Sequence, residues 1–202
     1  MYAVGINGSP RKGGNTQMLV TTVLDSLKEA EWETEFVQLG GQAIRGCQAC
    51  SGCFKKKDFT CVMQDDCFQE IFNKIMKADA VVIGSPTYYS DVNAEVKALL
   101  DRVGYVALAN NRALKGKIGA AVVAVRRGGA IHAFDSINHM YLMSQMVVPG
   151  SVYWNIGFGL RREDVKEDAE GIANMKNLAQ TIDLVARAVR PQVDQWPSLP
   201  GY

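Results

Sequence analysis

Short apolar runs alternate with longer amphipathic stretches along the chain. The short runs predict strands over residues 2–7, 33–39, 80–85, 116–125 and 150–156. The longer stretches repeat apolar residues at helical spacing and predict helices over residues 16–30, 67–78, 93–103, 130–146 and 163–189. Because residues 80–85 and 116–125 lack polar alternation, they are typical of central parallel strands that are covered on both faces. The alternation predicts an α/β fold.

The order of these elements also predicts a topology. Five strands that alternate with five helices imply a parallel sheet with right-handed crossovers. The compact doubly wound form of a five-stranded sheet has the strand order 2-1-3-4-5. Ligands bind such sheets beyond the carboxyl ends of the strands, at the switch point. The loops after strands one, three and four are therefore the places to search for chemistry.

Length and charge narrow the range of functions. At 202 residues the chain is long enough for one well-filled core, and nothing requires a second domain. With 22 Lys+Arg against 21 Asp+Glu, the formal charge of +1 offers no field for nucleic acid or an anionic membrane. The N-terminus lacks the layout of a signal peptide, and no apolar run reaches the roughly 18 residues of a membrane helix. We therefore expect a cytoplasmic protein with no nucleic-acid or membrane partner.

The last residues depart from the alternating pattern. Residues 191–202 contain three prolines and cannot continue the preceding helix. We therefore place one domain at residues 1–190 and a C-terminal tail at residues 191–202. A mobile tail is the favoured interpretation, and an arm that packs Trp196 on a neighbouring subunit is the alternative.

The loop after the first predicted strand has the composition of an anion cradle. It reads NGSPRKGGNT over residues 7–16 and leads straight into a helix. Its residues that permit close approach or donate hydrogen bonds are Gly8, Ser9, Arg11, Gly13, Gly14, Asn15 and Thr16. A P-loop is excluded because Gly-Asn stands where that motif needs Lys and Ser/Thr, and GINGSP lacks the third glycine of the dinucleotide fingerprint. A glycine-rich turn that only starts a capped helix is the alternative.

Together with SPTYYSDVNAEVKALLDR over residues 85–102, this loop carries a family resemblance. The chain resembles the NADPH-dependent FMN reductase group of flavodoxin-like proteins, whose pattern is G-S-P-R-x-x-S/G-N-T, then an S-P-x-Y loop and a D-R helix end. The resemblance covers roughly residues 1–190 and implies a flavodoxin-like fold that binds FMN. It implies that the phosphate is held by Ser9, Arg11, Asn15, Thr16 and Gln17, and that the isoalloxazine ring is lined by Pro86, Thr87, Tyr88 and Tyr89. A flat apolar ring also favours aromatic neighbours on physical grounds, with ordinary surface tyrosines as the alternative.

The loop after the fourth predicted strand reads RRGGAIHA over residues 126–133 and is expected at the same edge of the sheet. The resemblance implies a Gly-Gly beside the flavin in this region, which makes Arg127, Gly128 and Gly129 candidates. Their backbone amides or the guanidinium would stabilise negative charge near N1 and O2 of the reduced ring. A solvated pair of Arg126 and Arg127 is the alternative.

Four of the five cysteines crowd into the sixteen residues GCQACSGCFKKKDFTC, residues 46–61. An odd number of crowded cysteines in a reducing cytosol suits a metal site better than disulfides. The spacing Cys-x2-Cys-x2-Cys-x7-Cys resembles the iron-sulfur flavoprotein branch of the same group, in which such a run after strand two holds a [4Fe-4S] cluster. The resemblance implies a cysteine-rich loop at residues 46–67 with the ligands Cys47, Cys50, Cys53 and Cys61. Structural zinc, a redox-active thiol pair and an empty loop are the alternatives, with Cys67 as a reserve ligand.

These features together predict an FMN-dependent oxidoreductase of iron-sulfur flavoprotein type. It would relay electrons between a one-electron donor such as ferredoxin, a [4Fe-4S] cluster and FMN, with NAD(P)H as a further candidate donor. The cofactors carry this chemistry, so we name no catalytic side chain and give no role to His132 and His139. The resemblance also implies a homodimer or homotetramer.

Two other functions stay open at this point. An NAD(P)H-dependent FMN or quinone reductase would use the same fold without a cluster in its cysteine-rich loop. A zinc-stabilised interaction module would keep only a vestigial phosphate loop and would lose stability on chelation.

Overall fold

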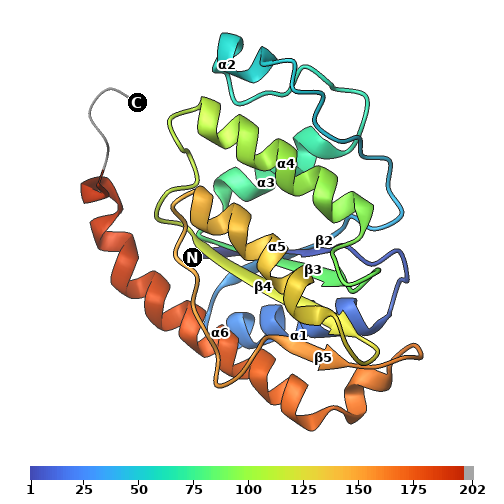
Figure 1. Ribbon diagram of the computed structural model, residues 1–202. Helices are drawn as coiled ribbons and strands as arrows, with labels where there is room; N and C mark the ends of the chain where they lie inside the picture. Colours follow the sequence, from blue (N-terminus) through green and yellow to red (C-terminus); the bar gives the residue numbers. More distant parts are fainter. Residues whose placement is uncertain (198–202) are drawn as a thin grey trace.

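Five parallel strands form one sheet in the order β2-β1-β3-β4-β5 in the computed structural model, which describes residues 1–197 (Figure 1). The strands are β1 (Tyr2–Asn7), β2 (Glu33–Gln38), β3 (Ala80–Pro86), β4 (Ile118–Val125) and β5 (Ile156–Phe158). In the register of the sheet, Val4 of β1 lies opposite Glu35 of β2 and Val81 of β3. The predicted α/β class and strand order are therefore confirmed.

Helices cover both faces of the sheet (Figure 1). One face packs against α1 (Asn15–Glu29) and α6 (Ala169–Val189), and the other packs against α3 (Phe68–Lys77), α4 (Ala94–Ala109) and α5 (Ala130–Met143). Alternate residues of β1 supply the two cores, since Ala3 joins the α1 and α6 side while Val4 and Ile6 join the other. The central strands β3 and β4 are buried almost throughout, as their unbroken apolar runs predicted.

The fifth strand is shorter and begins later than predicted. Only Ile156–Phe158 pair with β4, and residues 150–155 lie outside the strand. The side chains that suggested a longer strand, Val152, Tyr153 and Trp154, are at least half exposed. Their β propensity reflects bulk and branching, and they have no neighbouring strand to pack on at this edge, so propensity misplaced the strand.

The fourth helix is longer than predicted. The sequence placed its end at residue 103, before Gly104, but α4 continues to Ala109. A glycine weakens a helix by about 1 kcal/mol relative to alanine. Burial of Val106 and Ala107 in the core outweighs that cost, so the helix runs through the glycine.

The predicted helix over residues 163–189 is two elements. A short 3-10 helix, η1 (Asp164–Glu167), is followed by α6, and the two are separated by Asp168. The carboxylate of Asp168 accepts a hydrogen bond of 2.9 Å from the amide of Gly171, which caps α6. A capping residue therefore divides what the apolar pattern presented as one helix.

The cysteine-rich loop contains a helix that the sequence pattern did not predict. This helix, α2 (Gly52–Lys56), lies at the top of Figure 1, beyond α4 and away from the sheet. Its Phe54 ring meets Tyr105 of α4 edge to face, with 6.2 Å between the ring centroids. The loop therefore packs on the outer side of α4.

The C-terminal segment packs on its own chain as far as it is described. A 3-10 helix, η2 (Arg190–Gln195), follows α6 directly, and the Trp196 ring lies close to Gly116. The expectation of a mobile tail applies also to residues 198–202, which lie outside the described residues. Within residues 1–197, no helix combines the length and the apolar character needed to cross a membrane.

Candidate functional site

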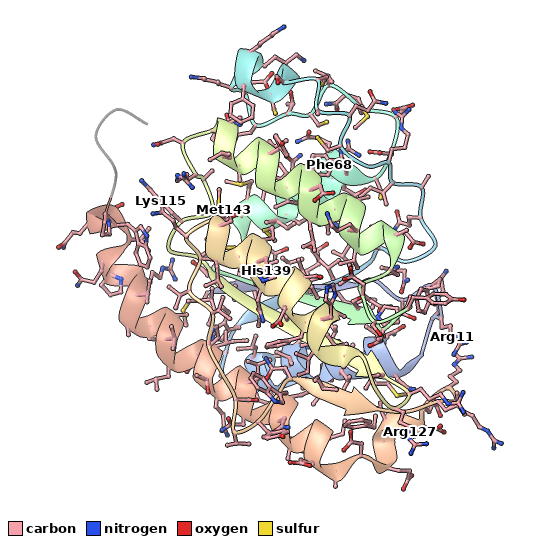
Figure 2. The ribbon with its side chains drawn as sticks, viewed as in Figure 1. Arg11, Phe68, Lys115, Arg127, His139 and Met143 are labelled. Carbon is pink, nitrogen blue, oxygen red and sulfur yellow. The ribbon has the colours of Figure 1, made fainter. Side chains whose placement is uncertain are left out.

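The loops predicted to carry chemistry gather at one edge of the sheet. Strands β1, β3, β4 and β5 end there at Asn7, Pro86, Val125 and Phe158. Figure 2 shows Arg11, from the loop after β1, and Arg127, from the loop after β4, at this same edge. The carboxyl ends of the strands therefore bring together residues that are far apart in the sequence.

The loops after β1 and β3 are joined by Gly8 and Asn93. The Gly8 amide donates to the Gly84 carbonyl at 2.8 Å, and the Asn93 side-chain amide donates to the Gly8 carbonyl at 2.7 Å. A Cβ on Gly8 would lie 2.2 Å from Val96, so only glycine fits this crossing. Asn93 is 1% exposed and also contacts the Ser85 hydroxyl, which makes it a joint that the sequence reasoning missed.

Side chains within the phosphate loop hold its shape. The Ser9 hydroxyl accepts from the Arg11 amide at 3.2 Å, and the Gln17 side chain accepts from the Gly13 amide at 2.6 Å. Gly13 has a φ of +65°, a conformation that favours glycine. The chain's own polar side chains therefore hold the loop in this conformation.

A fourth loop, after β5, adds residues that the sequence reasoning did not consider. The Asn15 side chain donates to the Arg161 carbonyl at 2.9 Å and accepts from the Val165 amide at 3.3 Å. The Arg162 Nε donates to the Gly13 carbonyl at 3.2 Å, which places a second cation beside Arg11's loop. The run GFGLRRED at residues 157–164 is the signal that would have identified this loop.

The phosphate loop keeps free donors of the kind that an anion needs. The backbone amides of residues 15–17 form the first turn of α1 and make no hydrogen bond to the rest of residues 1–197. The Thr16 hydroxyl and the exposed Arg11 guanidinium are also without a hydrogen-bond partner in that part of the chain. Free amides at a helix N-terminus and two nearby arginines suit a phosphate.

The loop after β3 carries the two tyrosines on a tight turn. The Thr87 hydroxyl donates to the Ala124 carbonyl of β4 at 3.1 Å, which fixes the start of the loop. Tyr88 and Asp91 exchange backbone hydrogen bonds, and Tyr89 and Ser90 between them have φ values of +49° and +65°. Two non-glycine residues with positive φ are strained, and such strain clusters at functional sites.

The tyrosines are exposed and available to a ligand. The Tyr88 residue is 45% exposed, and Tyr89 is fully exposed. Both residues lie on the loop that follows β3, and the loop after β4 touches this loop at Ser90. The structure is therefore consistent with a flat ligand against this turn.

The loop after β4 packs against the tyrosine turn. Gly129 has a φ of +87° and lies against Ser90, so the two loops touch. Arg127 and Gly128 are exposed, and a cavity of about 320 Å³ beside them is lined by Trp154 and residues of α6. The predicted flavin residues on three loops are thus brought to one edge of the sheet.

Asp91 connects the tyrosine turn to α5. Its carboxylate accepts from the Ser136 hydroxyl at 2.7 Å and lies 3.5 Å from Nδ1 of His132. Burial works to raise the pKa of Asp91, but hydrogen bonds from Ser136 and the Val92 amide outweigh it and lower the pKa. His132, which received no role, therefore stands at the rim of the site.

The four cysteines expected to bind a metal lie in one loop but do not form a preassembled site. Cys61 is buried against the core, Cys53 is partly buried, and Cys50 is exposed. In the described part of the chain, no three His, Cys, Asp or Glu side chains converge as a metal site. Burial raises the pKa of the Cys53 thiol, and the nearby Cys47 and Cys61 thiols add to the rise.

The backbone around the cysteines suits a metal centre that the chain would bind through several thiolates. Ala49, Ser51, Lys57 and Phe59 all have positive φ values, between +51° and +62°. Left-handed residues between right-handed ones turn successive amides toward one side and form concavities that bind anions, iron-sulfur centres among them. Four thiols on such a loop are the donor set of a [4Fe-4S] cluster or of structural zinc.

Solved structures with the same fold identify the structural class. A flavodoxin from the domain Archaea superposes with a TM-score of 0.58 at 18% identity, over 94% of this chain and 99% of the flavodoxin. The Trp repressor binding protein from Bacillus subtilis gives a TM-score of 0.65 at 18% identity, over 88% of this chain and 98% of that protein. The chain therefore has a flavodoxin-like fold.

The family follows from sequence comparison. The family model of NADPH-dependent FMN reductase matches residues 1–161, so the chain belongs to that family and is an FMN-dependent oxidoreductase. An iron-sulfur flavoprotein of Methanocaldococcus jannaschii is 33% identical over 197 residues, covering 94% of this chain and 100% of that protein. One from Methanosarcina thermophila is 33% identical over 198 residues, covering 96% of this chain and 100% of that protein.

Proposed function

We propose that this FMN-dependent oxidoreductase works as an iron-sulfur flavoprotein. A one-electron carrier such as ferredoxin would supply electrons to a [4Fe-4S] cluster on Cys47, Cys50, Cys53 and Cys61, and FMN would collect them in pairs for a two-electron acceptor. Each reduced carrier gives up one electron, so two carriers and protons from solvent reduce one FMN. The observation that carries the proposal is a preformed phosphate cradle and a four-cysteine loop on one chain.

The chain's own residues would bind and orient the FMN. The free amides at the start of α1 and the Thr16 hydroxyl would receive the phosphate, with Arg11 and Arg162 supplying positive charge. The exposed Tyr88 and Tyr89 would lie against the isoalloxazine ring. Arg127, at the neighbouring loop, would stabilise negative charge on the reduced ring.

The surface beside the cysteines suits an acidic electron carrier. Lys55, Lys56 and Lys57 are exposed and follow one another directly after Cys53 and Phe54. Phe54 and Phe59 are 37% and 45% exposed beside them, and Asp58 is the only acid between these two aromatics. A basic rim around apolar side chains steers a negatively charged partner toward the loop and supports its docking.

The rival function is an NAD(P)H-dependent FMN or quinone reductase whose cysteine-rich loop stays empty. It shares the fold and the phosphate cradle, and it requires no convergence of the four thiols. The two functions differ in whether iron and sulfide accompany FMN.

Purification without oxygen tests the proposal. We expect about four iron and four sulfide per chain together with one FMN. Cys50→Ser should lose the iron but keep the FMN, because Cys50 is exposed and far in sequence from the flavin loops. Cys67→Ala is the matched control and should keep both.

The outcomes separate the alternatives. Full FMN with no iron in the wild type contradicts the cluster and supports the rival reductase. Zinc in place of iron identifies a structural site. Loss of iron in Cys67→Ala would show that the ligand set is different from the one proposed.

A further inference from the structure

Arg102 is a buried arginine that none of the site residues requires. It lies on α4, is 1% exposed, and stacks its guanidinium 4.0 Å from the centre of the Phe68 ring at the start of α3. Figure 2 shows Phe68 beside α4, well away from the edge where Arg11 and Arg127 lie. A fully buried cation is costly unless it is paired and hydrogen-bonded, so its partners indicate its purpose.

Those partners are the two ends of the cysteine-rich loop. One guanidinium nitrogen donates to the Arg45 carbonyl at 3.2 Å, just before Gly46, and the other donates to the Met63 carbonyl at 2.9 Å. Residues 45 and 63 enclose all four predicted ligand cysteines. One side chain from α4 therefore closes the loop at its base.

Asp66 completes the closure from the loop's side. Its side chain is 2% exposed and pairs with Arg102. The same carboxylate accepts from the Arg45 amide at 3.0 Å and from the Phe68 amide at 3.1 Å. It therefore connects the segment that enters the loop to the start of α3. Arg102 and Asp66 together form a closed set of bonds across residues 45, 63, 66 and 68.

Elsewhere the loop is held less firmly. The Asn110 side chain accepts from the Phe59 amide at 3.2 Å, and the Gln69 side chain accepts from the Cys61 amide at 3.2 Å. Between Gly46 and Lys57 the hydrogen bond to α4 is a long one, from the Cys53 thiol to the Tyr105 carbonyl at 3.9 Å, beside the edge-to-face contact of Phe54 with Tyr105. The position of the thiols therefore depends on how the base of the loop is closed.

We infer that Arg102 and Asp66 are positioning residues for the cysteine-rich loop: they close its base in the metal-free chain and so set the reach of the four thiols before a cluster is inserted. Closing a long loop costs chain entropy, and a pair that bears this cost in advance lowers the cost of bringing four ligands to one centre. The inference rests on the proposed function for the identity of the ligand, while the loop closure itself is a property of this chain.

The test compares neighbouring aspartates. Asp66→Asn breaks the buried pair, and Asp65→Asn removes an exposed partner of Arg45 one residue away. Hydrogen exchange of the amides of residues 46–62 is measured in metal-free protein, and iron per chain is measured after reconstitution with iron and sulfide. We expect Asp66→Asn to exchange about a hundredfold faster across the loop and to lose most of its iron, because breaking a buried pair leaves an uncompensated charge. Asp65→Asn should match the wild type in both measurements.

A second variant guards against simple misfolding. Arg102→Lys keeps a buried cation near Asp66 but cannot reach the Arg45 and Met63 carbonyls together. With unchanged far-ultraviolet circular dichroism, it should show fast exchange in the loop, slow exchange in β3 and β4, and reduced iron. A folded Arg102→Lys with wild-type exchange in residues 46–62 overturns the inference.

The cluster and the loop closure can be disproved separately. If the wild type takes up no iron but the loop still opens in Asp66→Asn and Arg102→Lys, the cluster is wrong and the loop closure stands. If the wild type takes up iron and both variants take up as much with equal exchange, the cluster stands and the positioning role is wrong.

Discussion

The phosphate loop and the cysteine-rich loop are built in opposite ways. The phosphate loop is short and is bonded along its length to β3, to α1 and to the loop after β5. The cysteine-rich loop is long, carries four non-glycine residues with positive φ, and is held most firmly at its base by Arg102 and Asp66. Hydrogen bonds to the rest of the fold fix the conformation of the phosphate loop, whereas the cysteine-rich loop is fixed mainly at its base.

This difference shows what each site needs from its ligand. A phosphate can enter a cradle whose amides already point outward, so binding costs little reorganisation. Under the proposed function, a cluster would have to gather four thiols that do not converge in the described residues, which would couple loop folding to metal binding. Changes in the first loop should therefore affect the fold and FMN together, while most changes in the second should affect only the cluster.

The largest expected effect comes from the base of the cysteine-rich loop, where Arg102 pairs with Asp66. Burial raises the pKa of Asp66, but hydrogen bonds from Arg102 and from the Arg45 and Phe68 amides outweigh it, so the pKa is lowered. A lowered folded-state pKa gives stability that is present above the unfolded value of about 3.9 and is lost as the pH falls through the folded value. Asp66→Asn should cost about 3–5 kcal/mol at neutral pH.

Denaturant unfolding at several pH values measures this prediction. The difference between wild type and Asp66→Asn should be constant above about pH 5 and should shrink below about pH 4. A difference that does not change down to pH 3 would mean that the carboxylate charge contributes nothing.

Alanine substitutions at two glycines compare the two loops, because Gly40 packs against the phosphate loop and Gly46 begins the cysteine-rich loop. A Cβ on Gly40 would lie 2.2 Å from the Gly8 carbonyl oxygen and 2.2 Å from the Ser9 carbonyl carbon, whereas a Cβ on Gly46 would meet nothing within 4 Å. Because the contacted atoms are backbone, Gly40→Ala should cost about 3 kcal/mol and weaken FMN binding. Gly46→Ala should be neutral or slightly stabilising. Thermal unfolding and FMN titration of both variants check this, and equal losses would contradict the contrast.

Asn93 tests whether the phosphate cradle depends on its link to the loop after β3. Asn93→Ala leaves the Gly8 carbonyl without its side-chain donor and removes the side-chain oxygen that accepts from the Ser85 hydroxyl. We expect a loss of about 1–3 kcal/mol in stability and a weaker FMN complex. Asn73→Ala, which removes an exposed amide of α3, is the control and should change neither quantity. Unaltered FMN affinity in Asn93→Ala would show that the cradle holds without this link.

The smallest effect concerns the lysines beside the cysteines. Lys55→Gln with Lys56→Gln should slow reduction by an acidic ferredoxin about tenfold at low ionic strength. The charge-matched control, Lys28→Gln with Lys176→Gln on the α1 and α6 side, should leave the rate unchanged. Both rates should approach each other at high salt, since screening removes the steering. Equal slowing in both double variants would place the docking surface elsewhere.

The fold was largely predictable because its central strands are unambiguous. The apolar runs ending at Ser85 and Val125 have no alternative interpretation in a chain that alternates strands and helices. The errors lie where tertiary contacts override local preference, as at Gly104 inside α4 and at Val152 in the exposed segment before β5.

The candidate site was predictable where it follows a motif and not where it depends on packing. The loops after β1, β3 and β4 were predicted from the topology of the sheet, and the residues proposed within them came from the family resemblance. Asn93 and Arg162 were missed because their roles come from hydrogen bonds to Gly8 and Gly13 across the sheet edge. Arg102 was visible only as the end of a motif, and its contact with both ends of a distant loop has no local signal.

Reduction of FMN by reduced ferredoxin, followed by rapid mixing without oxygen, tests the central claim most directly. The wild type and Cys50→Ser, both loaded with FMN, are compared at equal concentrations. If electrons enter through a cluster on the cysteine-rich loop, the flavin of the wild type bleaches and that of Cys50→Ser does not. Bleaching of the flavin at the same rate in both proteins would contradict the account.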